Sequence, residues 1–205
     1  MPSTAWSCWK GYRSETMGIS EEEALDRLRA IREIFDLGVG AFALLTEEPA
    51  RSELSKYVVR YSDMGAFQVT ENDPVQEGWQ SSLEIRFHNT DYRRAAAELL
   101  ERSKRQAIIE SFDVVRQFAD ETPNWDVLAL EPWFYFTMFY RNAVAHNGRW
   151  KFDKKDRARL PMRFMNIPLD ESMEDQSIDG FLNLWQARQL LAKMELFVLG
   201  HRDLF

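Results

Sequence analysis

The 205-residue sequence contains a single cysteine, Cys8, and no long uninterrupted apolar segment. One cysteine cannot form a disulfide within the chain and is typical of proteins in a reducing compartment. No apolar run approaches the roughly 20 residues that a transmembrane helix needs, so we expect no membrane span. The N-terminus also lacks the basic and apolar regions of a signal peptide. Together these absences predict a cytoplasmic protein.

Short motifs of several enzyme classes are also missing. The chain has no His-Glu-x-x-His zinc motif, no cysteine cluster, no Gly-x-Ser-x-Gly elbow and no Gly-Lys-Ser/Thr phosphate loop. We therefore expect neither a metal nor a cofactor. Of the three histidines, His88 and His201 stand without partners in their own segments, and we expect structural or surface roles for both. The net charge of −7 argues against a protein that coats nucleic acid over its whole surface.

Aromatic residues, by contrast, are abundant, with seven Trp and fourteen Phe. They concentrate in Trp133–Tyr140, an apolar segment without a charge. A helix that is apolar on every side must be buried, either in a core or between subunits. The same helix then continues into Arg141, Asn142 and His146. Asn147-Gly148 predicts its end, because glycine readily adopts the left-handed conformation that stops a helix.

The spacing of these polar residues can be converted into geometry. Asn142 and His146 are four residues apart and lie about 40° from each other on one helix face. Arg141 and His146 are offset by about 140°, but the long arginine side chain could reach a ligand held by the histidine. Polar groups at the end of a buried helix cost free energy unless they are paired or used. These three residues are therefore the candidate catalytic site.

The segment Arg141-Asn142-Ala143-Val144-Ala145-His146 resembles the Arg-x4–6-His motif of the HEPN superfamily (higher eukaryotes and prokaryotes nucleotide-binding domains), in which a polar residue often follows the arginine. The resemblance covers this motif and the helical layout of about residues 90–202. It implies an α-helical and commonly dimeric protein. Many members are metal-independent ribonucleases of toxin–antitoxin and phage-defence systems, so the resemblance implies RNA as substrate and an antitoxin protein as partner.

The residue types suit that chemistry. RNA can be cut without metal when the 2′-hydroxyl attacks the adjacent phosphate, a reaction that needs proton transfer and positive charge at the phosphorane. His146 would transfer protons, Arg141 would bind phosphate oxygens with its two-pronged guanidinium, and Asn142 would orient the imidazole or hold a phosphate oxygen. Because each chain supplies only one such histidine, we expect a two-fold homodimer that joins the apolar helices and brings two copies of His146 together.

A basic segment follows the motif directly. Residues 149–163 carry seven basic and two acidic side chains in a chain that is acidic overall. Such a segment could steer RNA phosphates toward the motif. We assign RNA binding to Arg149, Lys151, Lys154, Lys155 and Arg157. The alternative is that the segment is a solvated loop with no ligand.

A non-catalytic alternative also remains open for the motif. Arg141 would pair with an acid such as Glu131 or Asp153, and His146 would merely cap the helix. The chain would then be a HEPN-like interaction module that binds a protein or a nucleotide.

The remaining pattern predicts an all-α fold, a bundle of about five helices with a small β-hairpin or irregular excursion after the motif helix. We expect residues 1–19 to form an aromatic arm and residues 20–205 to form one domain. Ser20 should cap a helix that runs to about Glu48. A second helix should start near Ala50. Its apolar positions are Leu54, Tyr57, Val58 and Tyr61. We further expect a strand at Leu83–Phe87 and helices at residues 91–121 and 178–200.

Overall fold

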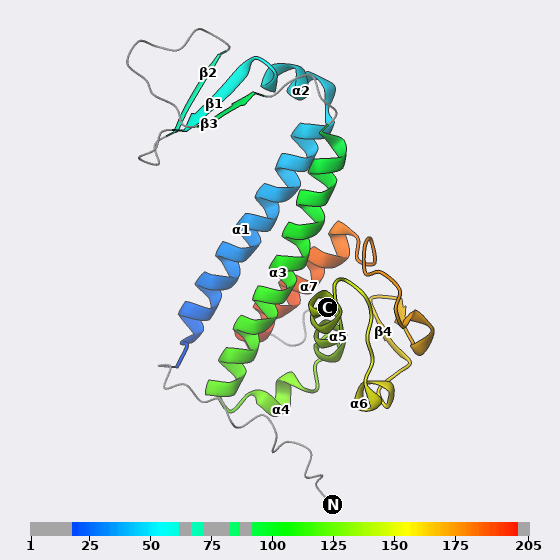
Figure 1. Cartoon of the computed structure of the whole chain (residues 1–205). Helices are drawn as coiled ribbons and strands as arrows, with labels where there is room; N and C mark the ends of the chain where they lie inside the picture. The colour runs from blue at the N-terminus through cyan, green and yellow to red at the C-terminus, as the bar shows by residue number, and fades with distance from the viewer. Residues whose placement is uncertain (1–17, 62–66, 72–82, 87–91, 201–205) are drawn as a thin grey trace, which may run out of the picture.

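The computed structural model of the chain describes residues 18–61, 67–71, 83–86 and 92–200 (Figure 1). The fold is predominantly helical with small β elements, as the sequence predicts. Most of the expected N-terminal arm, together with His88 and His201, lies outside the described residues.

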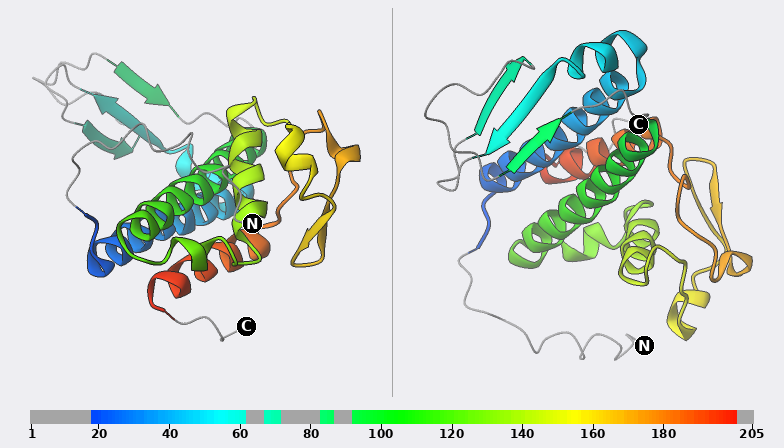
Figure 2. Two further views of the ribbon diagram at one scale, coloured as in Figure 1. Left: turned by 90° about the horizontal axis from the view of Figure 1, so that it is seen from below. Right: turned by 45° about the horizontal axis from the view of Figure 1, so that its top comes forward.

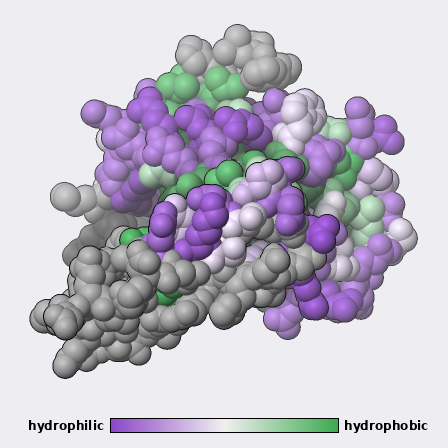
Figure 3. Space-filling model, turned by 90° about the horizontal axis from the view of Figure 1, so that it is seen from above, coloured by the Kyte–Doolittle hydropathy of each residue, from purple (hydrophilic) through white to green (hydrophobic). Residues whose placement is uncertain are grey.

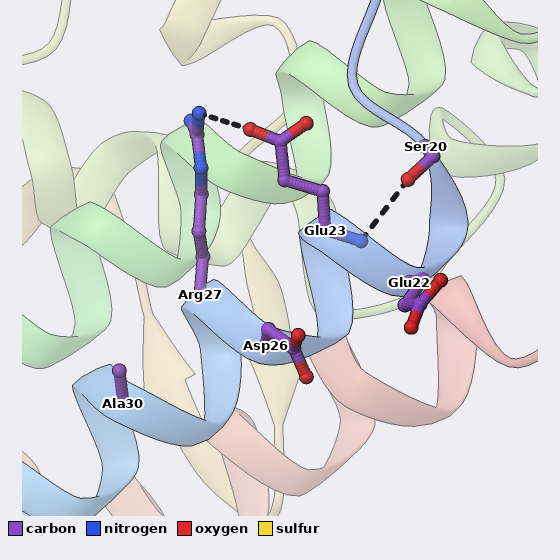
Figure 4. A pocket seen from close by; sticks show the side chains of 6 residues that line it. All are labelled: Ser20, Glu22, Glu23, Asp26, Arg27 and Ala30. Carbon is purple, nitrogen blue, oxygen red and sulfur yellow. Dashed lines mark hydrogen bonds and ion pairs between the residues drawn. The ribbon is translucent and has the colours of Figure 1, made fainter.

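Two long helices, α1 (Glu21–Thr46) and α3 (Arg93–Glu121), lie side by side in opposite directions (Figures 1 and 2). Ser20 caps α1 as predicted, because its hydroxyl accepts a 3.1 Å hydrogen bond from the backbone N–H of Glu23 (Figure 4). The pair approaches closely at Gly38: a Cβ at this position would lie 2.7 Å from Oγ of Ser103. The sequence therefore places glycine where α1 and α3 need the space.

A three-stranded sheet lies at one end of this helix pair (Figures 1 and 2). After α2 (Glu48–Leu54), strand β1 (Tyr57–Tyr61) pairs antiparallel with both β2 (Phe67–Glu71) and β3 (Leu83–Arg86). The strand predicted near Leu83 is confirmed. The prediction that the second helix continues past Leu54 is wrong, because the β-branched and aromatic residues of β1 favour a sheet once a partner strand is available.

The apolar helix α5 (Phe134–Ala145) lies in the core, where α3 and the hairpin strand β4 (Met162–Phe164) pack against it. The short α4 (Trp125–Leu128) precedes it, and α7 (Leu184–Val198) covers the other side of α3. Trp133 and Phe197 meet edge to face at 6.1 Å, and Phe136 lies 5.0 Å from Phe164. The residues of this stretch that are almost completely buried are Trp133, Phe134, Phe136, Thr137, Phe139 and Tyr140. The chain's own core therefore removes this stretch from water, and its burial requires no second subunit.

The predicted β-hairpin follows α5. After α6 (Lys154–Arg157), strands β4 (Met162–Phe164) and β5 (Ile167–Leu169) pair antiparallel, and η1 (Glu171–Met173) follows. The backbones of Trp150 and of residues 175–176 then exchange two hydrogen bonds. These bonds close the excursion into a lobe that packs on α5, with the aromatic rings of Trp150, Phe152 and Phe164 buried.

A partly buried polar cluster connects α3 to the loop before α7. The buried Lys104 donates to the carbonyl of Leu182 at 2.6 Å and to Glu101 at 2.7 Å, and Arg105 forms an ion pair with Asp179. Burial raises the pKa of the nearby Tyr140 hydroxyl, which has no hydrogen-bond partner within the described residues. The last helix, α7, begins at Leu184, later than predicted. Asn183 and Gln186 form a capping box at its start.

Candidate functional site

The motif residues lie at the C-terminal end of α5. The helix ends at Ala145, and His146 is its C-cap. Asn147 and Gly148 both adopt positive φ angles, 58° and 72°, and the Gly148 N–H turns back to bond the Ala143 carbonyl at 2.9 Å. The predicted helix end is confirmed, and its turn leaves the histidine on the surface.

Arg141 forms the principal ion pair of the site. Its Nε donates a 3.0 Å hydrogen bond to Oδ1 of Asp113 on α3, and 35% of its side chain remains exposed. Arg116, one turn further along α3, lies 3.9 Å from the same oxygen. Two arginines therefore share one carboxylate. The acids expected from sequence as partners for Arg141, Glu131 and Asp153, do not take this role.

The two terminal amino groups of Arg141 have no hydrogen-bond partner within the part of the chain that the structure describes. Guanidinium groups bind phosphate through two parallel N–H donors. Because Asp113 occupies only Nε, the outer edge of the guanidinium can still make such a contact. Asp113 thus fixes the arginine without using the donors that a phosphate needs.

Asn142 and His146 occupy the same side of α5, one turn apart, as the spacing predicts. Asn142 is half-buried and His146 is exposed. In the described residues neither side chain forms a hydrogen bond, so Asn142 does not orient the imidazole in this structure. Both groups are free to contact a ligand that approaches the end of α5.

The basic segment divides into two parts. Arg149 donates to the backbone carbonyl of Asp175 at 2.6 Å, and Lys151 forms an ion pair with the carboxylate of the same residue. The bond from Lys151 lowers the pKa of Asp175. Arg157 bridges Glu171 at 3.1 Å and Glu174 at 3.0 Å. These three cations are therefore engaged with the acidic residues that precede α7.

Lys154 and Lys155 differ from the other three predicted RNA-binding residues. Both are exposed on α6, and their amino groups form no ion pair with any described residue. Asp153 caps α6, and the buried Asp156 completes the capping box by accepting a 3.1 Å bond from the Asp153 N–H. Burial raises the pKa of Asp156. The cap holds both lysines on a defined turn that contacts solvent.

An aromatic and cationic pair lies near the N-terminal end of α5. The guanidinium of Arg159 stacks 4.4 Å from the ring centre of Tyr135. Tyr135 and Asn142 are seven residues apart and so lie on one side of the helix. Sequence reasoning missed Asp113 and Arg116 around Arg141, and also the pair of Tyr135 and Arg159. The first two lie on a helix 28 or fewer residues earlier in the chain, and no local pattern signals their approach.

In the described residues no group of three or more His, Cys, Asp and Glu side chains converges in a way that could hold a metal ion. None of the described helices combines the length and apolarity needed to cross a membrane. The chain matches no protein-family model, no curated protein sequence and no solved structure.

Proposed function

We propose that this protein is a metal-independent endoribonuclease of the HEPN type, cytoplasmic and acting in a toxin or phage-defence role. The observation that carries the proposal is the state of Arg141. Asp113 binds its Nε at 3.0 Å, while its two terminal amino groups stay available five residues before the exposed His146. A fixed guanidinium and an accessible imidazole within the last turns of one helix suit phosphodiester chemistry.

In the proposed reaction the 2′-oxygen attacks the adjacent phosphorus and the bond from phosphorus to the 5′-oxygen breaks. The 2′-hydroxyl loses its proton to a base, and the departing 5′-oxygen gains one. The products are a 2′,3′-cyclic phosphate and a 5′-hydroxyl end. His146 would transfer a proton at one of these oxygens, while Arg141 would bind the charged phosphorane oxygens. Asn142 would hold a further phosphate oxygen.

RNA would approach over α6. Lys154 and Lys155 are the predicted RNA-binding residues whose amino groups are not engaged with acidic side chains among the described residues. Exposed lysines of this kind attract phosphates in a salt-dependent manner. Arg149, Lys151 and Arg157 would contribute less to binding, because the acidic residues before α7 already offset their charge.

A second candidate is a non-catalytic HEPN-like interaction module for a protein or a nucleotide. The pairing of Arg141 with Asp113 favours it, because an arginine in an ion pair can serve structure alone. The same surface would then bind an antitoxin or another partner without cleaving RNA.

Cleavage of RNA in excess chelator separates the two candidates. The ribonuclease should release 2′,3′-cyclic phosphate ends, and the His146→Ala protein should not. An interaction module should bind RNA or protein and leave every RNA intact.

A further inference from the structure

An apolar groove with a volume of about 530 Å³ runs between α1 and α3. Its apolar lining includes Ile34, Leu37 and Leu99, whose exposed fractions are 63%, 73% and 48%. Apolar residues also reach the surface between hydrophilic ones in the view of Figure 3. Contiguous exposed apolar surface of this kind marks an interaction site.

On α1 apolar residues that reach the surface recur every three or four positions and so form one stripe along the helix. Its members are Ala30, Ile34, Leu37, Ala41 and Leu44. The stripe is nearly symmetric about its middle, because the small Ala30 and Ala41 flank the large Ile34 and Leu37 at equal spacing. From Ala30 to Ala41 the face therefore presents the same pattern when it is read in either direction.

On α3 the rim of the groove carries opposite charges at its two ends. Arg102 and Glu110 each lie four residues from Gln106. Within the described residues Arg102 has only a 4.0 Å contact with Glu98, and Glu110 accepts a 2.6 Å bond from the Gln106 amide. Such exposed pairs contribute little and rearrange easily.

We propose that a second copy of this chain covers the groove in a two-fold, antiparallel arrangement of α1 on α1 and α3 on α3. When two α3 helices pair about Gln106, Arg102 of each copy meets Glu110 of the other. When two α1 helices pair midway between Ile34 and Leu37, these two residues meet across the axis. Charge and apolar complementarity are therefore both satisfied by the same chain.

The two centres coincide in space. Gly38 contacts Ser103 within one copy, which fixes the relative level of α1 and α3. Gln106 is three residues after Ser103, and the centre of the α1 stripe is about three residues before Gly38. Because α1 and α3 run in opposite directions, a step forward along α3 and a step backward along α1 lead to the same height along the helix pair. One two-fold axis thus serves both helices.

This arrangement keeps the two candidate sites apart. Asp113, which holds Arg141, lies in one copy level with Leu99 of the other. Along the helix axis the two Asp113 residues are therefore as far apart as Leu99 and Asp113 within one α3, which is about 21 Å. Each copy would therefore use its own Arg141 and His146, in contrast to the shared site that the sequence predicts through α5. The proposed interface does not depend on the proposed ribonuclease activity.

Sedimentation equilibrium of the full-length chain tests the interface. The parent protein should be a dimer at micromolar concentration. Leu37→Glu should be monomeric with an unchanged far-ultraviolet circular dichroism spectrum, because that side chain is mostly exposed within one copy. Leu130→Glu, at an 82% exposed position outside the groove, is the matched control and should remain dimeric.

Charge reversal provides a second test that leaves the apolar groove intact. Arg102→Glu and Glu110→Arg should each weaken the dimer by about tenfold or more, because each places like charges opposite one another twice. The protein with both reversals should regain most of the parental affinity. A monomeric parent protein up to about 100 μM would overturn the proposal. So would a dimer that none of these groove variants weakens.

Discussion

Asp113 accepts a 3.0 Å hydrogen bond from Nε of Arg141 across 28 residues of sequence and two helices. The bond connects the end of α5 to the C-terminal half of α3, the longest helix in the described part of the chain. It holds the guanidinium by its inner nitrogen, so the outer nitrogens remain available. This geometry fixes Arg141 in place and leaves its outer nitrogens for the phosphate contact that we propose.

The first prediction concerns Asp113 as a positioning residue. Asp113→Ala should lower kcat for RNA cleavage by about 100-fold with a smaller effect on KM, because a guanidinium displaced by about 1 Å no longer meets the phosphorane. Asp113→Asn retains an acceptor oxygen and should recover much of kcat. Asp126→Ala, which removes an exposed acid from α4, serves as the control. Equal losses of kcat for the alanine variants of Asp113 and Asp126 would show that Asp113 does not position Arg141 for the reaction.

The second prediction separates the two halves of the basic segment. Lys154→Glu with Lys155→Glu should weaken RNA binding and flatten its salt dependence, with no change in Tm, because both side chains are exposed. Arg157→Glu should instead lower Tm, because it places a third acid beside Glu171 and Glu174. Filter binding across a salt series and thermal unfolding measure the two effects. If the dependence of RNA affinity on salt concentration is unchanged in the double lysine variant, these lysines contribute to solubility alone.

The third prediction compares two glycines of α1. Gly38→Ala should destabilise the fold, because its Cβ would lie 2.7 Å from Oγ and 3.0 Å from Cβ of Ser103. Gly40→Ala meets nothing within 4 Å and should stabilise the fold by about 1 kcal/mol through helix propensity. Urea unfolding gives both free energies. Combining Gly38→Ala with Ser103→Gly should recover part of the loss, whereas a loss that this second change does not reduce would exclude the close contact as its cause.

The fourth prediction concerns pH and Asp156. Burial raises the pKa of this carboxyl, so the folded chain binds its proton more tightly than the unfolded chain. The contribution of Asp156 to stability is therefore greatest below the ordinary aspartate pKa and falls as pH rises through the raised folded pKa. Asp156→Asn keeps the acceptor for the Asp153 N–H but cannot titrate. The Tm of Asp156→Asn minus the Tm of the parent should increase as the pH rises from 4 to 7. A Tm difference that stays constant over this range would contradict the account.

Local patterns were sufficient for several elements. The Ser20 cap, the burial of Trp133–Tyr140, the stop at Asn147-Gly148 and the hairpin after the motif all depend on neighbouring residues, and each is confirmed. The strand at Tyr57–Tyr61 was missed because its residues also fit a helical spacing, and only the pairing with β3 decides between them.

Long-range pairing explains what sequence reasoning did not find at the candidate site. Asp113 reaches Arg141 only because α3 and α5 pack together, and many acids in the chain were equally plausible partners from sequence. The opposite charges of the basic segment and of the acidic residues before α7 could have suggested that Arg157 pairs with Glu171 and Glu174. The RNA substrate and the role of His146 remain predictions.

Cleavage of RNA by the purified chain in excess chelator tests the central claim most directly. The parent protein should produce 2′,3′-cyclic phosphate and 5′-hydroxyl ends, and His146→Ala should lower the rate by at least about 100-fold while its circular dichroism spectrum is unchanged. His201→Ala, which removes another histidine of the chain, should retain parental activity. Cleavage that requires a divalent metal ion, that survives His146→Ala, or that the parent protein fails to perform on any RNA would contradict a metal-independent ribonuclease built on Arg141 and His146.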